Sequence, residues 1–259
     1  MTIFEAVVLA IVEGLTEFLP VSSTGHLILA SSLLHLESTD FVKTYIVSIQ
    51  FGAILSVILL YWKEFFKSLQ FYWTLFIAFL PAAILGLLFH SYIEAFLGNV
   101  FMVIINLLVV GIILLFIDKL GNHQTEKQIT TKNAFIIGLF QALAMFPGVS
   151  RSAATIIGGL SQKLSRKQAA EFSFFLAVPT IAAAAFLEMY KHFSVISEPY
   201  HLKLILLGNV ISFIVAWIVI KIFIQFLVKH GFKVFGWYRI ILSLIFLLLI
   251  ALNVNLTNI

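Results

Sequence analysis

Six long apolar runs dominate the chain and restrict the folds that it can adopt. A helix needs about 20 apolar residues to cross the hydrocarbon core of a bilayer. Runs of that length cover approximately residues 43–62, 70–90, 99–118, 171–190, 203–226 and 236–253. Only 11% of the 259 residues are charged, against roughly 25% in a soluble domain. We therefore predict an all-α integral membrane protein, a single membrane domain over residues 1–259 with six transmembrane helices.

Other features of the composition exclude several classes of protein. The chain has no cysteine, which rules out disulfides, thiolate catalysis and zinc–thiolate sites. Its net charge of +4 is modest, and basic loops are usual in membrane proteins, so we predict no nucleic-acid partner. Three glutamates, Glu5, Glu13 and Glu17, interrupt the apolar start of the chain, which has no basic n-region. This start is therefore expected to belong to the fold and not to a cleaved signal peptide.

Two shorter apolar stretches differ from the six spans. Each stops at a proline, Pro20 or Pro147, passes through a hydroxyl-rich loop and resumes as a short apolar segment. Proline ends a helix because it lacks a donor and clashes with the preceding turn. Apolar runs of about 10–14 residues are more often re-entrant than spanning. We predict that residues 2–34 and 134–160 form two re-entrant helical hairpins.

Basic residues indicate the orientation in the membrane. If one loop between spans is cytoplasmic and the hairpins do not change sides, ten lysines and arginines lie on that side, in residues 63–69, 119–133, 161–170 and 227–235. The opposite side has only Lys43, Lys191 and Lys203. Since cytoplasmic loops carry the excess of basic residues, both termini are predicted to lie outside. The first hairpin then enters from the outer face and the second from the cytoplasm.

The two halves of the chain resemble each other. Pro20 and Pro147 are 127 positions apart, and Tyr61 and Tyr190, which each end a span beside a lysine, are 129 apart. We interpret this as a duplication, with pseudo-repeats of approximately 1–125 and 126–259, although chance similarity between apolar segments is the alternative. Opposite entry sides make it an inverted-topology repeat, an architecture that places its site near the bilayer midplane.

The first hairpin contains two acidic residues, Glu13 and Glu17, which share one helix face because they are four positions apart. An ionisable group at membrane depth costs at least about 2.5 kcal/mol and is a functional candidate by default. The alternative is a shallow hairpin with both carboxylates hydrated at its rim. If they are functional, they ligate a divalent metal through hard oxygens or orient a neighbouring base.

The loop after Pro20 offers hydroxyls and an imidazole. Ser22, Ser23 or Thr24 can cap the next helix, and a helix start of this kind also binds anions. His26 lies three residues after Ser23, within reach on a helix. A lone histidine in an apolar chain is more often structural, but one beside a hydroxyl and two carboxylates favours a base or a nucleophile.

The second loop carries Arg151, the specific signal of that hairpin. A buried arginine is costly unless it meets an anion, and its planar fork suits phosphate; the alternative is a pair with one of the hairpin glutamates. Gly148 permits a tight turn and close backbone approach. Ser150, Ser152 and Thr155 either cap the following helix or hold phosphate oxygens. Carboxylates, imidazole, guanidinium, hydroxyls and two helix N-termini together indicate a phosphate or diphosphate ligand in the membrane.

Both motifs closely resemble the bacterial undecaprenyl-diphosphate phosphatase family, of the bacitracin-resistance type. The matching stretches are EGLTEFLPVSSTGH at 13–26 and PGVSRSAAT at 147–155, with further likeness at 171–174 and 177–179. The resemblance covers essentially the whole chain. It implies an enzyme of the bacterial inner membrane that removes the terminal phosphate of undecaprenyl diphosphate and so recycles the cell-wall lipid carrier.

The resemblance also implies dependence on a divalent cation, Mg²⁺ or Ca²⁺, and we expect Glu13 and Glu17 either to hold this ion or to orient His26. The residues that match functional positions of the family are Glu13, Glu17, Ser23, His26 and Arg151. The residues expected to contact the substrate are Ser22, Thr24, Gly148, Ser150, Ser152 and Thr155. Gln141 stands where a mirrored copy of the acidic pair would place a glutamate, so one hairpin is expected to be catalytic and the other to clamp the substrate.

A reaction can be outlined on these residues. Arg151 neutralises the terminal phosphate, and Ser23 attacks it with His26 as base, or His26 attacks directly; water as the nucleophile stays open. Expected partners are a polyprenyl diphosphate and membrane lipids, with a homodimer left open, and the site is expected to open to the periplasmic face. The main alternative function is transport or flipping of the lipid carrier, and a structural scaffold is a third.

Overall fold

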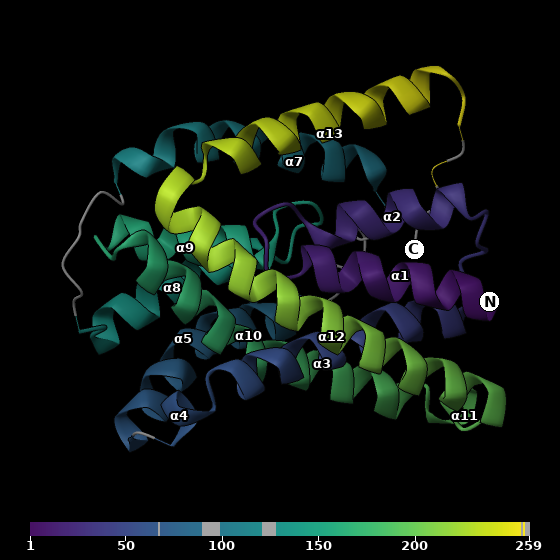
Figure 1. Cartoon of the computed structure of the whole chain (residues 1–259), viewed down its shortest axis with the longest axis horizontal. Coiled ribbons are helices and arrows are strands. Elements are labelled where there is room, and N and C mark those ends of the chain that lie inside the picture. Colours follow the sequence, from purple (N-terminus) through teal and green to yellow (C-terminus); the bar gives the residue numbers. More distant parts are fainter. Residues whose placement is uncertain (67, 90–98, 121–127, 255, 257–259) are drawn as a thin grey trace.

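The computed structural model describes residues 1–259 except 67, 90–98, 121–127, 255 and 257–259 (Figure 1). Every regular element in these described ranges is a helix. The helices long and apolar enough to cross a membrane are α3 (Asp40–Leu60), α5 (Leu69–Leu88), α7 (Val100–Phe116, extended by η1, Ile117–Lys119), α10 (Arg166–Lys191), α12 (Pro199–His230) and α13 (Lys233–Ala251). The prediction of an all-α membrane protein with six spans is confirmed.

Several spans are longer than their apolar runs, because polar capping residues set the ends of a helix. The run predicted at 171–190 lies in α10, which begins at Arg166 after Ser165 caps it by accepting a hydrogen bond from the backbone N–H of Gln168. Helix α12 begins at Pro199 and ends before Gly231, whose φ is +72°. Proline at the first position and glycine after the last are favoured helix boundaries. The apolar run therefore marks the part that matches lipid, not the whole helix.

The outward faces of the spans are apolar. Helices α5, α7, α12 and α13 all expose large hydrophobic side chains, among them Phe76, Ile105, Ile218 and Leu248. A soluble monomer rarely exposes such continuous apolar surface. A bilayer is the solvent that this surface fits.

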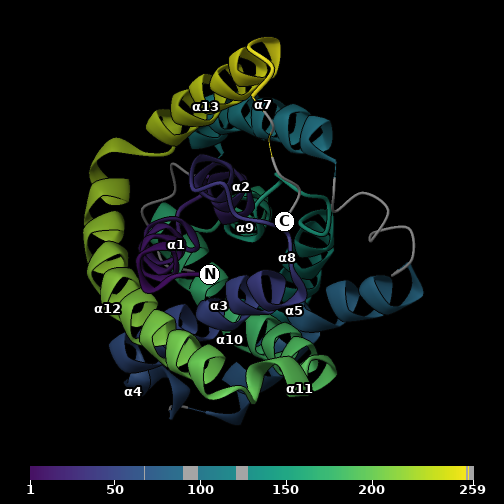
Figure 2. The same cartoon turned by 90° about the vertical axis from the view of Figure 1, so that its right-hand side faces the viewer.

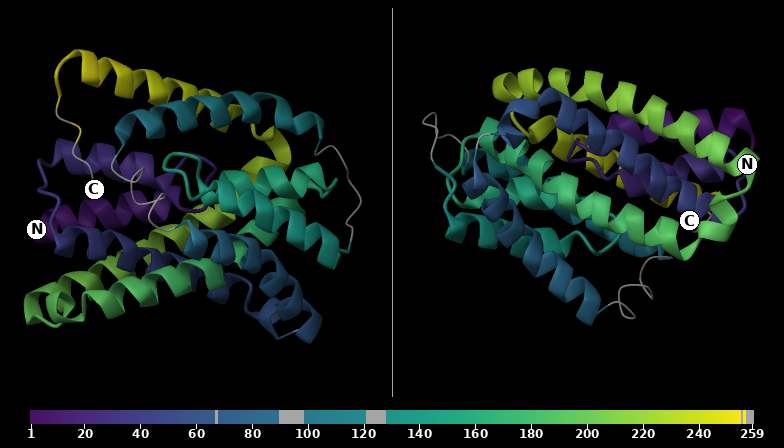
Figure 3. Two further views of the ribbon diagram at one scale, coloured as in Figure 1. Left: turned by 180° about the vertical axis from the view of Figure 1, so that it is seen from behind. Right: turned by 90° about the horizontal axis from the view of Figure 1, so that it is seen from below.

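Two helical hairpins complete the fold. The first consists of α1 (Ile3–Thr16) and α2 (Ser23–Leu33), and the second of α8 (Thr131–Leu143) and α9 (Arg151–Ser161). Short helices α4 (Trp62–Phe65) and α11 (Phe193–Ile196) follow α3 and α10. In Figure 1 the two hairpins approach from opposite ends of the molecule, with their loops meeting near its centre, and the reverse view in Figure 3 agrees.

The second helix of each hairpin starts in the same way. Ser22 and Ser150 are the N-caps of α2 and α9, with φ of +73° and +75°. Each hydroxyl accepts a hydrogen bond from a backbone N–H three residues later. Positive φ is uncommon for serine and costs conformational energy. The two hairpin loops therefore share an unusual local geometry, as the predicted duplication requires.

Each hairpin packs against a span from the other half of the chain. A Cβ at Gly14 of α1 would lie 2.9 Å from the Ser212 carbonyl oxygen of α12, and one at Gly138 of α8 would lie 2.3 Å from the Ala78 carbonyl oxygen of α5. Helices α3 and α10 pack together, as do α7 and α13. Viewed end-on in Figure 2, α1, α2 and α9 lie toward the centre, with α12, α13 and α7 around them. Entry of the hairpins into the bilayer, and the inverted repeat, stay predictions.

Candidate active site at the hairpin loops

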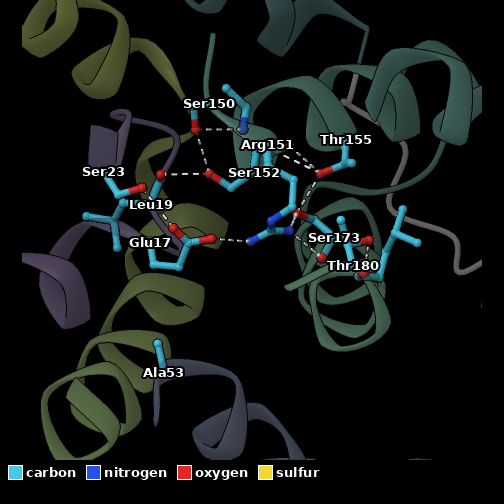
Figure 4. Close-up of polar contacts among 12 residues, drawn as sticks. Glu17, Leu19, Ser23, Ala53, Ser150, Arg151, Ser152, Thr155, Ser173 and Thr180 are labelled. Carbon is cyan, nitrogen blue, oxygen red and sulfur yellow. Dashed lines mark hydrogen bonds and ion pairs between the residues drawn. The ribbon is translucent and has the colours of Figure 1, made fainter. Parts of the chain in front are cut away.

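The two hairpin loops are joined directly by side chains. Arg151, the first residue of α9, lies with Nη2 3.1 Å from Oε1 of Glu17, just after α1. Ser152 donates a hydrogen bond of 2.7 Å to the carbonyl oxygen of Leu19. Figure 4 shows Glu17 and Arg151 pointing toward each other between the loops. Residues that the sequence predicts to act together, but that are over 130 positions apart, thus share one site.

Arg151 is held from a second direction by α10. Its Nη1 donates to the Ser173 carbonyl oxygen at 2.9 Å, and the hydroxyls of Ser173 and Thr155 lie 2.7 Å apart, within hydrogen-bond distance. Its Nε is buried and has no acceptor among the described residues. A buried donor without a partner is costly, so this N–H is available to an anionic ligand. The pairing with a hairpin glutamate, first considered as an alternative, is present and leaves capacity for phosphate.

Glu17 connects the guanidinium to a hydroxyl. Its Oε2 accepts a 2.8 Å hydrogen bond from Ser23, while its Oε1 faces Arg151. The side chain is 7% exposed. A carboxylate that accepts the hydrogen bond of a hydroxyl can take its proton, so Glu17 is placed to activate Ser23.

His26 has partners other than Ser23. Its Nδ1 lies 2.8 Å from the Ser22 carbonyl oxygen and its Nε2 lies 2.6 Å from the Tyr238 hydroxyl. Since a carbonyl can only accept, Nδ1 carries the proton and Nε2 accepts from Tyr238. Among the described residues no Ser23–His26 hydrogen bond is present, so the expected hydroxyl–imidazole couple is not formed in this structure. The physical reason is that the His26 ring hydrogen-bonds to the carbonyl oxygen of Ser22, four residues earlier in the chain.

Arg239 connects both loops to the rest of the fold, although it was not among the residues predicted from the sequence. It is fully buried in α13. Its guanidinium donates to four carbonyl oxygens, at Pro20 and Gly148 of the two loops and at Asn106 and Leu107 of α7. The signal was present, because an arginine inside an apolar run is a functional candidate by default.

The second loop also approaches α7 closely. Gly148 has φ of +88°, and a Cβ there would lie 2.5 Å from the Val103 carbonyl oxygen. The Asn106 side-chain amide donates a 2.7 Å hydrogen bond to the Pro147 carbonyl oxygen. The tight turn and close approach expected of Gly148 are therefore present, although they serve contact with α7.

The chain matches a known protein family over most of its length. The family model of the bacitracin resistance protein BacA matches residues 6–245, which include both hairpins. The chain belongs to the bacitracin resistance protein BacA family. Proteins named undecaprenyl-diphosphatase are similar to it over almost their whole length. That of Flavobacterium psychrophilum is 52% identical, with 96% of each chain covered. That of Porphyromonas gingivalis is 50% identical, with 99% of each chain covered. That of Aquifex aeolicus is 44% identical, with 95% of this chain and 98% of the relative covered.

The remaining candidate residues of this BacA-family chain have varied positions. Ser150 caps α9, and its hydroxyl lies 3.0 Å from that of Ser152. Thr155 also hydrogen-bonds back to the Arg151 carbonyl oxygen. Thr24 is exposed in the first turn of α2. Ser173 and Tyr238 contact the candidate groups but were not predicted, because neither stands in a hairpin.

Glu13 is the main candidate ligand for a metal ion in this BacA-family chain. It is fully buried, and neither carboxylate oxygen has a hydrogen-bond partner among the described residues. A buried carboxyl group needs a proton or a cation. No cluster of three or more His, Cys, Asp or Glu residues occurs in the described part of the chain. Mg²⁺ is commonly held by one or two carboxylates together with substrate phosphate oxygens and water, so Glu13 and Glu17 fit such an ion.

Proposed function

We propose that this chain hydrolyses undecaprenyl diphosphate to undecaprenyl monophosphate and inorganic phosphate. The observation that carries the proposal is the partly buried connection Ser23–Glu17–Arg151, which places a hydroxyl, its proton acceptor and a phosphate-binding guanidinium together. The names of the similar proteins support the same substrate and reaction.

Substrate binding begins with the terminal phosphate. Arg151 offers its free Nε–H, while Ser173 and Glu17 hold the rest of the guanidinium in place. The N-termini of α2 and α9 add backbone N–H groups and the positive ends of two helix dipoles. These groups stabilise the charge that collects on the equatorial oxygens in the transition state.

Ser23 is the proposed nucleophile and Glu17 its base. As Glu17 accepts the hydroxyl proton, the Ser23 Oγ bonds to the terminal phosphorus and the bond from that phosphorus to the bridging oxygen breaks. Undecaprenyl monophosphate leaves with the bridging oxygen. Water then hydrolyses the phosphoserine, releasing inorganic phosphate and restoring Ser23. His26 orients the loop through the Ser22 carbonyl oxygen in this scheme.

A divalent cation, Mg²⁺ or Ca²⁺, would be held by Glu13 and Glu17. When bound, such an ion neutralises phosphate charge near the reacting group. Mg²⁺ is commonly bound by one or two carboxylates together with phosphate oxygens and water, which matches the two acidic side chains here, Glu13 in α1 and Glu17 at its C-cap.

The proposed location is the bacterial inner membrane, with both hairpins re-entrant, the halves related as inverted repeats and the site open to the periplasmic face. The excess of basic residues in four loops supports this orientation. The first hairpin packs against α12 and the second against α5, so each packs against a span of the other half, and this symmetry supports the repeat.

The decisive experiment measures phosphate release from undecaprenyl diphosphate by the purified full chain in detergent. We expect release by the wild type and a loss of at least about 100-fold in Arg151→Ala. Light scattering on the same sample tests the homodimer. No release by a folded wild type, together with lipid flipping in liposomes, would replace hydrolysis by transport.

A further inference from the structure

An apolar cavity lies between α1, α12 and α13, beside the first hairpin loop. Its volume is about 490 Å³, within the roughly 300–1,000 Å³ of ligand pockets. Leu15 and Leu19 of the first hairpin form one wall, and Val219 and Phe223 of α12 another, with Phe235 of α13 beside them. Such a lining suits a hydrocarbon ligand and offers little to a polar one.

The lining of the cavity includes a few polar groups. Three side chains with polar atoms line it, namely Thr16, His26 and Tyr238. The Thr16 hydroxyl donates within its own helix to the Val12 carbonyl oxygen, so it has no proton left to donate to a ligand. His26 and Tyr238 hydrogen-bond to each other, with their rings stacked at a centroid distance of 5.5 Å. His26 lies three residues after Ser23, about one helical turn away.

The cavity also faces the lipid side of the protein. Leu15, Ile222 and Val234 line it from three different helices, and they are 45%, 61% and 50% exposed. Those exposed faces belong to the apolar outer surface of the fold. A chain lying in the cavity can therefore continue into the hydrocarbon of the bilayer without crossing a polar layer.

We propose that this cavity binds the polyprenyl chain of the lipid substrate next to its diphosphate, with the His26–Tyr238 pair at the junction of chain and headgroup. The inference rests on the proposed function. An amphipathic ligand whose phosphate meets Arg151 needs an apolar path out of the polar loops. This cavity supplies such a path, and His26 in its lining lies about one helical turn from Ser23. The first isoprene units fill it, and the remainder of the chain lies in the bilayer.

The test fills the cavity with a larger side chain and measures KM and kcat with a long and a short prenyl diphosphate. Val219 lines the cavity, whereas its neighbour Ile218 is exposed and does not, so Val219→Phe and Ile218→Phe are matched variants. With undecaprenyl and farnesyl diphosphate we expect Val219→Phe to raise KM about tenfold, as the loss of roughly two buried methylene contacts would. We expect little change in kcat, and wild-type behaviour from Ile218→Phe. Equal KM values for both variants and the wild type, in an active enzyme, would refute the cavity and leave the proposed hydrolysis standing.

A binding measurement keeps the inference testable if no hydrolysis is detected. A farnesyl diphosphate analogue with a photoreactive group on its first isoprene unit is cross-linked to the full chain in detergent and located by mass spectrometry. We expect labelling at α12 and α13 cavity residues, weakened by Val219→Phe and by excess undecaprenyl phosphate. Labelling outside the cavity would overturn the proposal. Labelling displaced only by a phospholipid would also overturn it, because the cavity would then bind bilayer acyl chains.

Discussion

Glu17 Oε1 lies 3.1 Å from Nη2 of Arg151, although the residues are 134 positions apart in the chain. The other oxygen of the same carboxylate accepts the hydroxyl of Ser23. One buried carboxylate thus meets the cation that binds phosphate and the hydroxyl that attacks it. A phosphate that draws Arg151 toward itself would leave Glu17 freer to accept the proton of Ser23.

Replacement of Ser23 by alanine tests the nucleophile. We expect Ser23→Ala to lower kcat roughly thousandfold, because the attacking hydroxyl is lost while Arg151 and its partners stay. Ser197→Ala is the control, since Ser197 is an exposed serine after α11 whose hydroxyl bonds only to the nearby Phe193 carbonyl oxygen. Rapid quench of the wild type followed by mass spectrometry should show phosphoserine at position 23. A phosphohistidine at His26, or full activity in Ser23→Ala, would contradict this mechanism.

Glu13→Gln tests the cation. It keeps the shape of the buried side chain and removes its charge, so we expect the Mg²⁺ concentration for half-maximal activity to rise at least about tenfold. Electron paramagnetic resonance of bound Mn²⁺ provides a reading that does not depend on turnover. Glu5→Gln is the matched control on the same helix, because glutamine can keep the capping box. Unchanged Mn²⁺ binding in Glu13→Gln would remove Glu13 from the metal site.

Arg239→Met tests the clamp between the loops. It removes the donors of four hydrogen bonds to carbonyl oxygens. We expect a loss of about 3 kcal/mol in the free energy of unfolding, seen as a lower Tm in detergent, together with reduced activity because both loops lose a common anchor. Trp237→Phe, a change at an exposed neighbour, should leave both quantities near the wild type. A Tm and activity equal to the wild type in Arg239→Met would show that the clamp is dispensable.

Gly148→Ala tests the close approach of the second loop to α7. The added Cβ meets the Val103 carbonyl oxygen at 2.5 Å, and alanine is strained at a φ of +88°. We expect a destabilisation of about 2 kcal/mol and a loss of phosphate release as the loop moves. Gly86→Ala serves for comparison, because its Cβ has no contact shorter than 3.7 Å. Equal losses of Tm in both variants would contradict the role of the close approach.

The spans and the candidate residues of the two loops could be predicted because their signals are local. Apolar length marks a span, and a proline followed by serines and an arginine stands out in an apolar chain. The partners could not be predicted in the same way. Nothing near His26 in the sequence indicates Tyr238, and nothing near Arg151 indicates Ser173, since these contacts arise from packing between helices far apart in the chain. Arg239 had a local signal, but its four acceptors are backbone atoms, which no residue type reveals.

The packing of α1 against α12 has a consequence for biosynthesis. Residues 3–16 leave the ribosome long before residues 199–230, which form the surface that covers Gly14. Helix α1 therefore cannot pack in its final position until most of the residues that follow it have been made. Until then the carboxyl groups of Glu13 and Glu17 lack Arg151 as well, so the assembling protein must keep them hydrated or neutral, and the site forms as a late event of insertion.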